Sequence, residues 1–136
     1  MSTKVFVNLP VTDLKRSMAF YKALGFSFNP QFTNDSGACM VISEHNYAML
    51  LTKPFFETFL TKPIADASQT TGVLVALGLE SRAAVDALVA KAIEAGGKEP
   101  RPKQDHGFMV QRTIEDPDGH IWEPFWMDPA HVQPAG

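Results

Sequence analysis

Hydrophobic and polar residues alternate along two separate stretches of this chain. Residues 4–11, KVFVNLPV, place Val5, Val7, Leu9 and Val11 on one side of an extended strand. Residues 73–79, VLVALGL, alternate in the same way. A period of two is typical of a strand that packs one face against a core, so both stretches are predicted to be strands.

A helical pattern follows each of these strands. In residues 12–26 the helix is expected to begin after Asp13 as N-cap and to end before Gly25. In residues 80–98 Ser81 can cap the start, and Gly96 ends the pattern. The predicted apolar stripes are Leu14, Met18, Tyr21 and Leu24 in the first helix, and Val85, Leu88, Val89, Ala92 and Ile93 in the second.

The remaining pattern predicts further strands and a repeated unit. Strands are expected at 26–33, 38–43 and 46–52, with a turn at 44–46, and a closing hairpin is expected on either side of DPDG at 116–119. The order predicts an α+β fold of two βαβββ modules in one domain. Its parts are module one at 1–52, a linker with one short helical turn at 53–71, module two at 72–128 and a tail at 129–136.

Charge and composition narrow the class of partner. A net charge of -3 argues against nucleic acid, because phosphate binding needs a basic surface. A single cysteine, Cys39, rules out an intramolecular disulfide, and its apolar neighbours indicate a small core residue. There is no apolar run of membrane-spanning length and no signal-peptide pattern, so we expect a cytoplasmic protein with no membrane partner.

Two motifs resemble those of a known family. V-x-D-L-x-x-S-x-x-F-Y-x-x-L-G-F from Val11 to Phe26, and D-P-D-G-x-x-x-E from Asp116 to Glu123, are similar to the vicinal oxygen chelate superfamily. That superfamily contains glyoxalase I, extradiol dioxygenases, and fosfomycin- and bleomycin-resistance proteins. The resemblance implies two βαβββ modules whose sheets curl around a cavity, with metal ligands on the concave faces.

The positions that match the family's metal ligands are nearly all apolar here. The resemblance assigns them to Phe6, Leu50, Leu74 and Glu123. Phe and Leu donate nothing to a metal, and one carboxylate holds a divalent cation weakly. We therefore expect no metal centre and no cofactor, with Glu123 as the one catalytic candidate.

Strand alternation from these four positions predicts which residues face the cavity. The expected pocket residues are Phe6, Asn8, Leu50, Thr52, Leu74, Ala76, Arg112, Glu123 and Phe125. Arg112 is included because pairing Asp116 with Gly119 places it opposite Glu123; a one-residue bulge would bring Gln111 or Thr113 there instead. An ionised Glu123 paired with Arg112 would be a poor general base.

Three functions fit this pattern. The favoured one is a homodimeric protein that binds a small organic molecule in its cavity without a metal, as bleomycin-resistance relatives do. The second is a metal-dependent lyase or dioxygenase that uses Glu123 with an unusual ligand such as His106, although an exposed loop histidine is the simpler interpretation. The third is partner binding through the linker aromatics Phe55, Phe56 and Phe59 and through Trp126.

Overall fold

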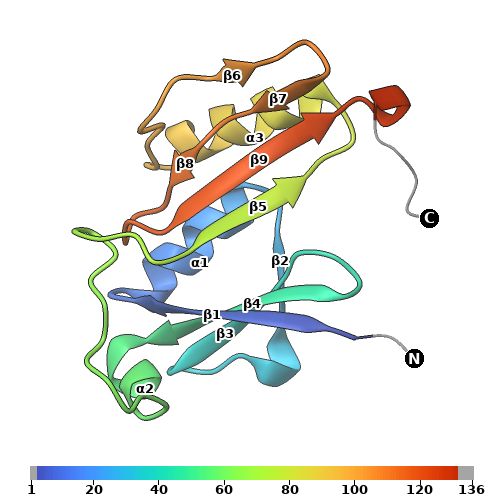
Figure 1. The fold of residues 1–136 in the computed structure, drawn as a ribbon. Coiled ribbons are helices and arrows are strands. Elements are labelled where there is room, and N and C mark those ends of the chain that lie inside the picture. The colour runs from blue at the N-terminus through green and yellow to red at the C-terminus, as the bar shows by residue number, and fades with distance from the viewer. Residues whose placement is uncertain (1–2, 132–136) are drawn as a thin grey trace. The chain divides into compact units, whose positions relative to one another are not determined.

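The computed structural model describes residues 3–131, and Figure 1 shows the course of the chain. The chain forms two compact units, which meet in the sequence at Thr70 and Thr71. Each unit holds one sheet, and each begins with a strand followed by a helix. The structure has the α+β fold that the sequence predicts. Of the tail predicted at 129–136, residues 132–136 lie outside the described residues.

The first unit has a four-stranded sheet in the order β1-β4-β3-β2. Its elements are β1 (Val5–Val11), α1 (Leu14–Ala23), β2 (Ser27–Asn29), the 3-10 helix η1 (Pro30–Phe32), β3 (Gly37–Val41), β4 (Asn46–Thr52) and α2 (Lys53–Glu57). β1 runs parallel to β4, and the other neighbours are antiparallel. The predicted strand at 26–33 ends at Asn29, because Pro30 has no N–H for a ladder and the Asn29 side chain caps η1.

Helix α1 has the predicted caps. The Asp13 side chain accepts a hydrogen bond from the Arg16 backbone N–H at 3.1 Å, and Gly25 ends the helix with a φ of 105°. The buried residues of the helix and its end are Ser17, Phe20, Tyr21 and Leu24. The helix packs on β3 and β4, where its buried face meets an apolar layer formed by Leu9, Val11, Ala38, Met40, Ala48 and Leu50. This layer is the core of the first unit.

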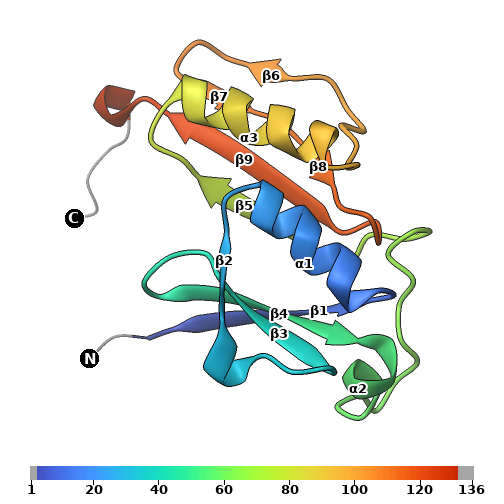
Figure 2. The ribbon, with the colours of Figure 1, turned by 180° about the vertical axis from the view of Figure 1, so that it is seen from behind.

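The second unit has a five-stranded sheet with the order β5-β9-β7-β6, in which β8 also pairs with β9. Its elements are β5 (Leu74–Gly78), α3 (Arg82–Glu94), β6 (Gln104–Asp105), β7 (Met109–Gln111), β8 (Ile114–Glu115), β9 (Ile121–Met127) and the 3-10 helix η2 (Pro129–His131). Figure 2 shows α3 lying across β9 and β7 on one face of this sheet. The buried helix residues Val85, Leu88, Val89 and Ala92 supply the core there, whereas Ile93 is exposed.

The DPDG hairpin differs from the predicted one by a single residue. Asp116 pairs with His120 rather than with Gly119, since the Asp116 N–H donates to the His120 carbonyl at 2.9 Å. The loop therefore has three residues, Pro117 to Gly119, and Gly119 takes the left-handed conformation at a φ of 98°. A turn followed by a left-handed glycine is the usual geometry of a three-residue hairpin loop. The extra residue shifts the whole ladder between β9 and β7–β8.

No helix within residues 3–131 is long and apolar enough to cross a bilayer.

Candidate functional site

The face of the first sheet that lies opposite α1, here called the open face, carries an aromatic pair. Parallel pairing of β1 with β4 sets Phe6 beside Tyr47, and their rings stack with centroids 4.7 Å apart and an angle of 12° between the planes. Phe6 is 48% exposed. Aromatic surface of this size is normally buried, and its exposure marks candidate binding surfaces.

The same register corrects the predicted facing of β4. Leu50 pairs with Leu9 and Thr52 with Val11, and both partners belong to the buried layer beneath α1. Leu50 is itself fully buried, so the prediction that Leu50 and Thr52 face a cavity is wrong. The reason is a one-residue error in strand parity, which moves every side chain to the other face. The residues of β4 on the open face are Tyr47, Met49 and Leu51.

A pocket of about 250 Å³ lies on the open face. It is lined by Lys4, Phe6, Asn29, Phe32, Cys39, Tyr47 and Met49. Cys39 and Met49 are cross-strand partners, and Cys39 is buried, with its thiol pKa raised by desolvation. Phe32, at the end of η1, is 60% exposed. The pocket is therefore apolar, with aromatic rings at the surface and a cysteine and a methionine on the sheet.

In the second unit, Glu123 lies on the face of the sheet opposite α3. Its neighbours on that face are Ala76, which is its partner across the ladder, and Ile121 and Phe125 on its own strand. Leu74 and Gly78 share the face, and Leu74 is 55% exposed. The Phe125 ring lies over Gly78, because a Cβ added at Gly78 would come within 3.3 Å of that ring.

Arg112 does not pair with Glu123, contrary to the prediction. The one-residue shift of the hairpin sets Arg112 opposite Pro124, and its N–H donates to the Pro124 carbonyl at 3.0 Å. Its guanidinium instead binds Glu99 through two hydrogen bonds, of 2.8 and 2.9 Å, and binds Asp86 of α3 at 2.9 Å. Within residues 3–131, Glu123 forms no ion pair.

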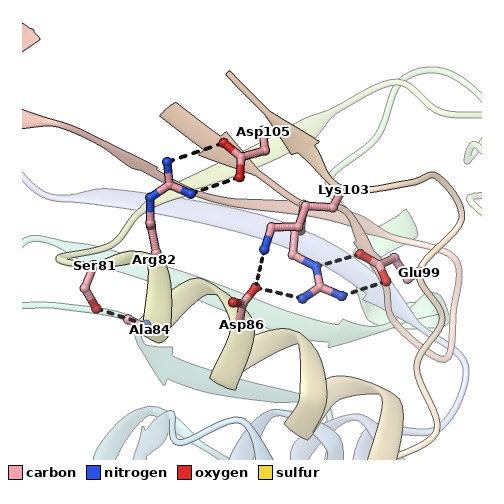
Figure 3. Close-up of polar contacts among 8 residues, drawn as sticks. Ser81, Arg82, Ala84, Asp86, Glu99, Lys103 and Asp105 are labelled. Carbon is pink, nitrogen blue, oxygen red and sulfur yellow. Dashed lines mark hydrogen bonds and ion pairs between the residues drawn. The ribbon is translucent and has the colours of Figure 1, made fainter. Parts of the chain in front are cut away.

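These contacts belong to a charged cluster on the α3 side of the second unit. Figure 3 shows Asp86 on α3 with Lys103, whose Nζ lies 3.3 Å from Asp86 Oδ1, and shows Arg82 paired with Asp105. Hydrogen bonds from Arg112 hold the pKa of Glu99 and of Asp86 below their usual values, and the two carboxylates raise the pKa of Arg112. The cluster joins α3 to β6, to the segment between α3 and β6 that carries Glu99 and Lys103, and to Arg112 between β7 and β8, which is a structural role.

The side chains at the four positions that match the family's metal ligands do not suit a metal ion. Phe6, Leu74 and Glu123 lie on the sheet faces opposite the helices, and only Glu123 offers an oxygen. Correcting the parity of β4 replaces Leu50 by Met49 or Leu51, neither of which has the oxygen or nitrogen donor that a divalent cation of this kind needs. No group of three or more His, Cys, Asp or Glu within the described part of the chain is arranged to hold a metal.

His106 is an exposed loop residue, which agrees with the simpler of the two interpretations given for it from the sequence. It lies between β6 and β7, where its backbone N–H donates to the Met109 carbonyl at 2.8 Å. Its ring centroid lies 6.2 Å from that of Phe108. These contacts account for its position without a role as a ligand.

Sequence reasoning missed most residues of the pocket on the open face. Lys4 precedes the first strand, and Asn29 and Phe32 flank the proline at which β2 ends. Tyr47 and Met49 alternate in NYAMLLT with the period of a strand. The alternation within β4 could have found them. If the other set of alternate β4 residues is assigned to the face that carries Phe6, Tyr47 and Met49 lie on that face.

Comparisons with known proteins agree with this fold. A family model described as bleomycin resistance protein-like N-terminal matches residues 3–43. A hypothetical protein, SA1046 from S. aureus, is 29% identical, with 93% of this chain and 95% of that chain covered and a TM-score of 0.77. A glyoxalase-related enzyme from Fulvimarina pelagi is 22% identical, with 100% and 94% covered and a TM-score of 0.79.

A further structural match is a glyoxalase/bleomycin resistance protein/dioxygenase family enzyme from Burkholderia phytofirmans PsJN. It is 17% identical, with 93% of this chain and 99% of that chain covered and a TM-score of 0.77. No curated protein matches the sequence. The motifs, the fold of the two units and these matches agree: the chain has the fold of the glyoxalase, bleomycin-resistance and dioxygenase proteins, and its residues 3–43 match the bleomycin resistance protein-like model.

Proposed function

We propose that this protein binds a small planar organic molecule on the open face of its first sheet, without the superfamily's metal centre. The observation that carries the proposal is the stacked pair of Phe6 and Tyr47, which stands at an apolar pocket with one ring about half exposed. A flat ligand can extend such a stack and cover the exposed ring surface. Binding pockets in proteins combine this kind of apolar wall with a few polar groups.

The size of the pocket limits the ligand. At about 250 Å³ it is smaller than the roughly 300–1,000 Å³ common for larger organic ligands. A compound of one or two rings suits this volume. The proposal includes no metal, because Glu123 is the only residue with an oxygen donor among the four positions that match the family's metal ligands.

A titration with a neutral fluorescent two-ring compound, 2-naphthylmethanol, tests the proposal. Phe6→Ala and Tyr47→Leu should each weaken binding by roughly three- to tenfold, the loss expected when an aromatic contact is removed. Phe59→Ala is the matched control, because Phe59 is 67% exposed and makes an edge-to-face contact with Phe55 outside the pocket. The proposal is wrong if 2-naphthylmethanol does not bind, or if Phe59→Ala weakens binding as much as Phe6→Ala.

Elemental analysis of protein purified without chelator tests the second part of the proposal. The expected result is no transition metal in stoichiometric amount. One tightly held metal per chain would contradict it, and loss of that metal in Glu123→Gln would identify the ligand responsible.

A further inference from the structure

Lys4 is the one charged residue among those that line the pocket on the open face. Its ammonium lies 5.8 Å from the centroid of the Tyr47 ring, at the stacked pair. Within residues 3–131 no carboxylate forms an ion pair with it. The nearby acidic residue Glu44, whose carbonyl accepts a hydrogen bond from the Tyr47 hydroxyl, has its carboxylate 3.8 Å from His45 Nε2. The aromatic wall therefore carries a positive charge that no side chain of the described chain neutralises.

The second polar group of the pocket also offers donors. Asn29 uses its side-chain oxygen to accept the Gln31 backbone N–H at 3.0 Å. Because only an oxygen can accept that bond, the group that Asn29 has left for a ligand is its amide NH₂. Tyr47 directs its hydroxyl to the Glu44 carbonyl at 2.9 Å, so this hydroxyl hydrogen is already used. The side-chain donors that remain for a ligand are thus the Lys4 ammonium and the Asn29 amide NH₂, while the Tyr47 hydroxyl oxygen can still accept.

A pocket of this kind favours one class of ligand. A carboxylate or similar anionic group accepts hydrogen bonds from both donors and neutralises the ammonium, whereas a cation would meet an unpaired like charge. The aromatic wall favours a flat ring as the body of the ligand.

We propose that the pocket selects planar aromatic molecules that carry an anionic group such as a carboxylate, and that Lys4 determines this specificity. The proposal rests on the proposed function, because Phe6 and Tyr47 must hold the ring before Lys4 can select its charge. Lys4 acts on the ligand directly and does not support the fold, since it is exposed and precedes the first strand.

The test compares three naphthyl compounds that differ in charge: 2-naphthoate, neutral 2-naphthylmethanol and cationic 2-naphthylmethylamine. Wild-type protein should bind 2-naphthoate about tenfold more tightly than the neutral alcohol, as expected for a charge-assisted hydrogen bond. The amine should bind more weakly than the alcohol. The preference should shrink at high salt, because the pocket is partly open to solvent.

Lys4→Gln should remove the preference for 2-naphthoate over 2-naphthylmethanol, while Lys4→Arg should keep that preference. Lys22→Gln is the matched control, since the Lys22 ammonium also lies 5.8 Å from a ring centroid, that of Phe28, outside this pocket. Equal affinity of wild-type protein for the acid and the alcohol, or a preference retained in Lys4→Gln, would overturn the inference and leave the proposed function standing. Failure of all three compounds to bind would overturn both.

Discussion

Arg112 and Glu123 lie on opposite faces of the second sheet. Arg112 pairs with Pro124 on the ladder and extends its guanidinium to Asp86 on α3, whereas Glu123 lies beside Ala76 on the face away from the helix. The left-handed residue Gly119 in the hairpin loop causes the separation, because it shifts the ladder by one residue. Arg112 therefore stabilises the packing of α3, and Glu123 lies on the face of the sheet opposite α3.

Replacing Arg112 should destabilise the fold. Arg112→Met would leave Glu99 and Asp86 without their main partner, and the side chains of Arg112 and Glu99 are only 19% and 21% exposed. We expect a loss of about 2 kcal/mol in the free energy of unfolding, measured by urea denaturation. Arg101→Met is the control, because Arg101 is an exposed residue of the segment that carries Glu99 and forms no ion pair within residues 3–131. Equal midpoints for the two variants would show that the cluster contributes nothing.

The same cluster predicts a fall in stability at acid pH. Arg112 holds the pKa of Glu99 and of Asp86 below their unfolded values, which are about 4.3 and 3.9. A lowered folded pKa gives stabilisation that is complete above the unfolded pKa and is lost as the pH falls through the folded one. The free energy of unfolding should therefore decline below about pH 5, and less steeply in Arg112→Met. Parallel pH curves for wild type and variant would contradict this assignment.

Glu123→Ala should leave stability almost unchanged. Glu123 has no ion pair within the described residues, and substitutions at partly exposed positions of this kind usually change the free energy of unfolding by less than about 0.5 kcal/mol. Thermal and urea denaturation of Glu123→Ala beside Arg112→Met measure the contrast. A loss in Glu123→Ala as large as that in Arg112→Met would restore a structural role for Glu123.

Gly25 should be harder to replace than Gly72. Gly25 ends α1 with a φ of 105°, which is costly for any residue with a Cβ, so Gly25→Ala should cost roughly 1–2 kcal/mol. Gly72 has no positive φ and no atom within 4 Å of an added Cβ, and Gly72→Ala is the control. Urea denaturation of the two variants tests the comparison, and similar midpoints would contradict the role of the left-handed cap.

Elements defined by local signals could be predicted from the sequence. The caps at Asp13, Gly25 and Ser81 and the alternation in the first strand of each unit were visible along the chain, and the structure confirms them. The two motifs indicated the fold that the solved structures share. The burial of Cys39 followed from its apolar neighbours.

Properties that depend on pairing between strands could not be predicted. The facing of Leu50 is decided by the register of β4 against β1, and NYAMLLT is apolar on both faces, so its pattern does not indicate which one is buried. The partner of Arg112 depends on whether the DPDG loop has two or three residues, a difference of one residue that reverses the face. The pocket was missed for the same reason, because Phe6 and Tyr47 meet only across that ladder.

The most direct test of the proposed function locates the ligand on the protein. Backbone amide chemical shifts, recorded by NMR during titration with 2-naphthylmethanol and with 2-naphthoate, report which residues sense binding. Saturable shifts should gather at Phe6, Phe32, Tyr47 and Met49, with Lys4 responding most to 2-naphthoate. In Tyr47→Leu the same shifts should need roughly three- to tenfold more ligand to saturate. Shifts that gather around Glu123 and Phe125 instead, or no saturable shift with either compound, would contradict a binding site on the open face of the first sheet.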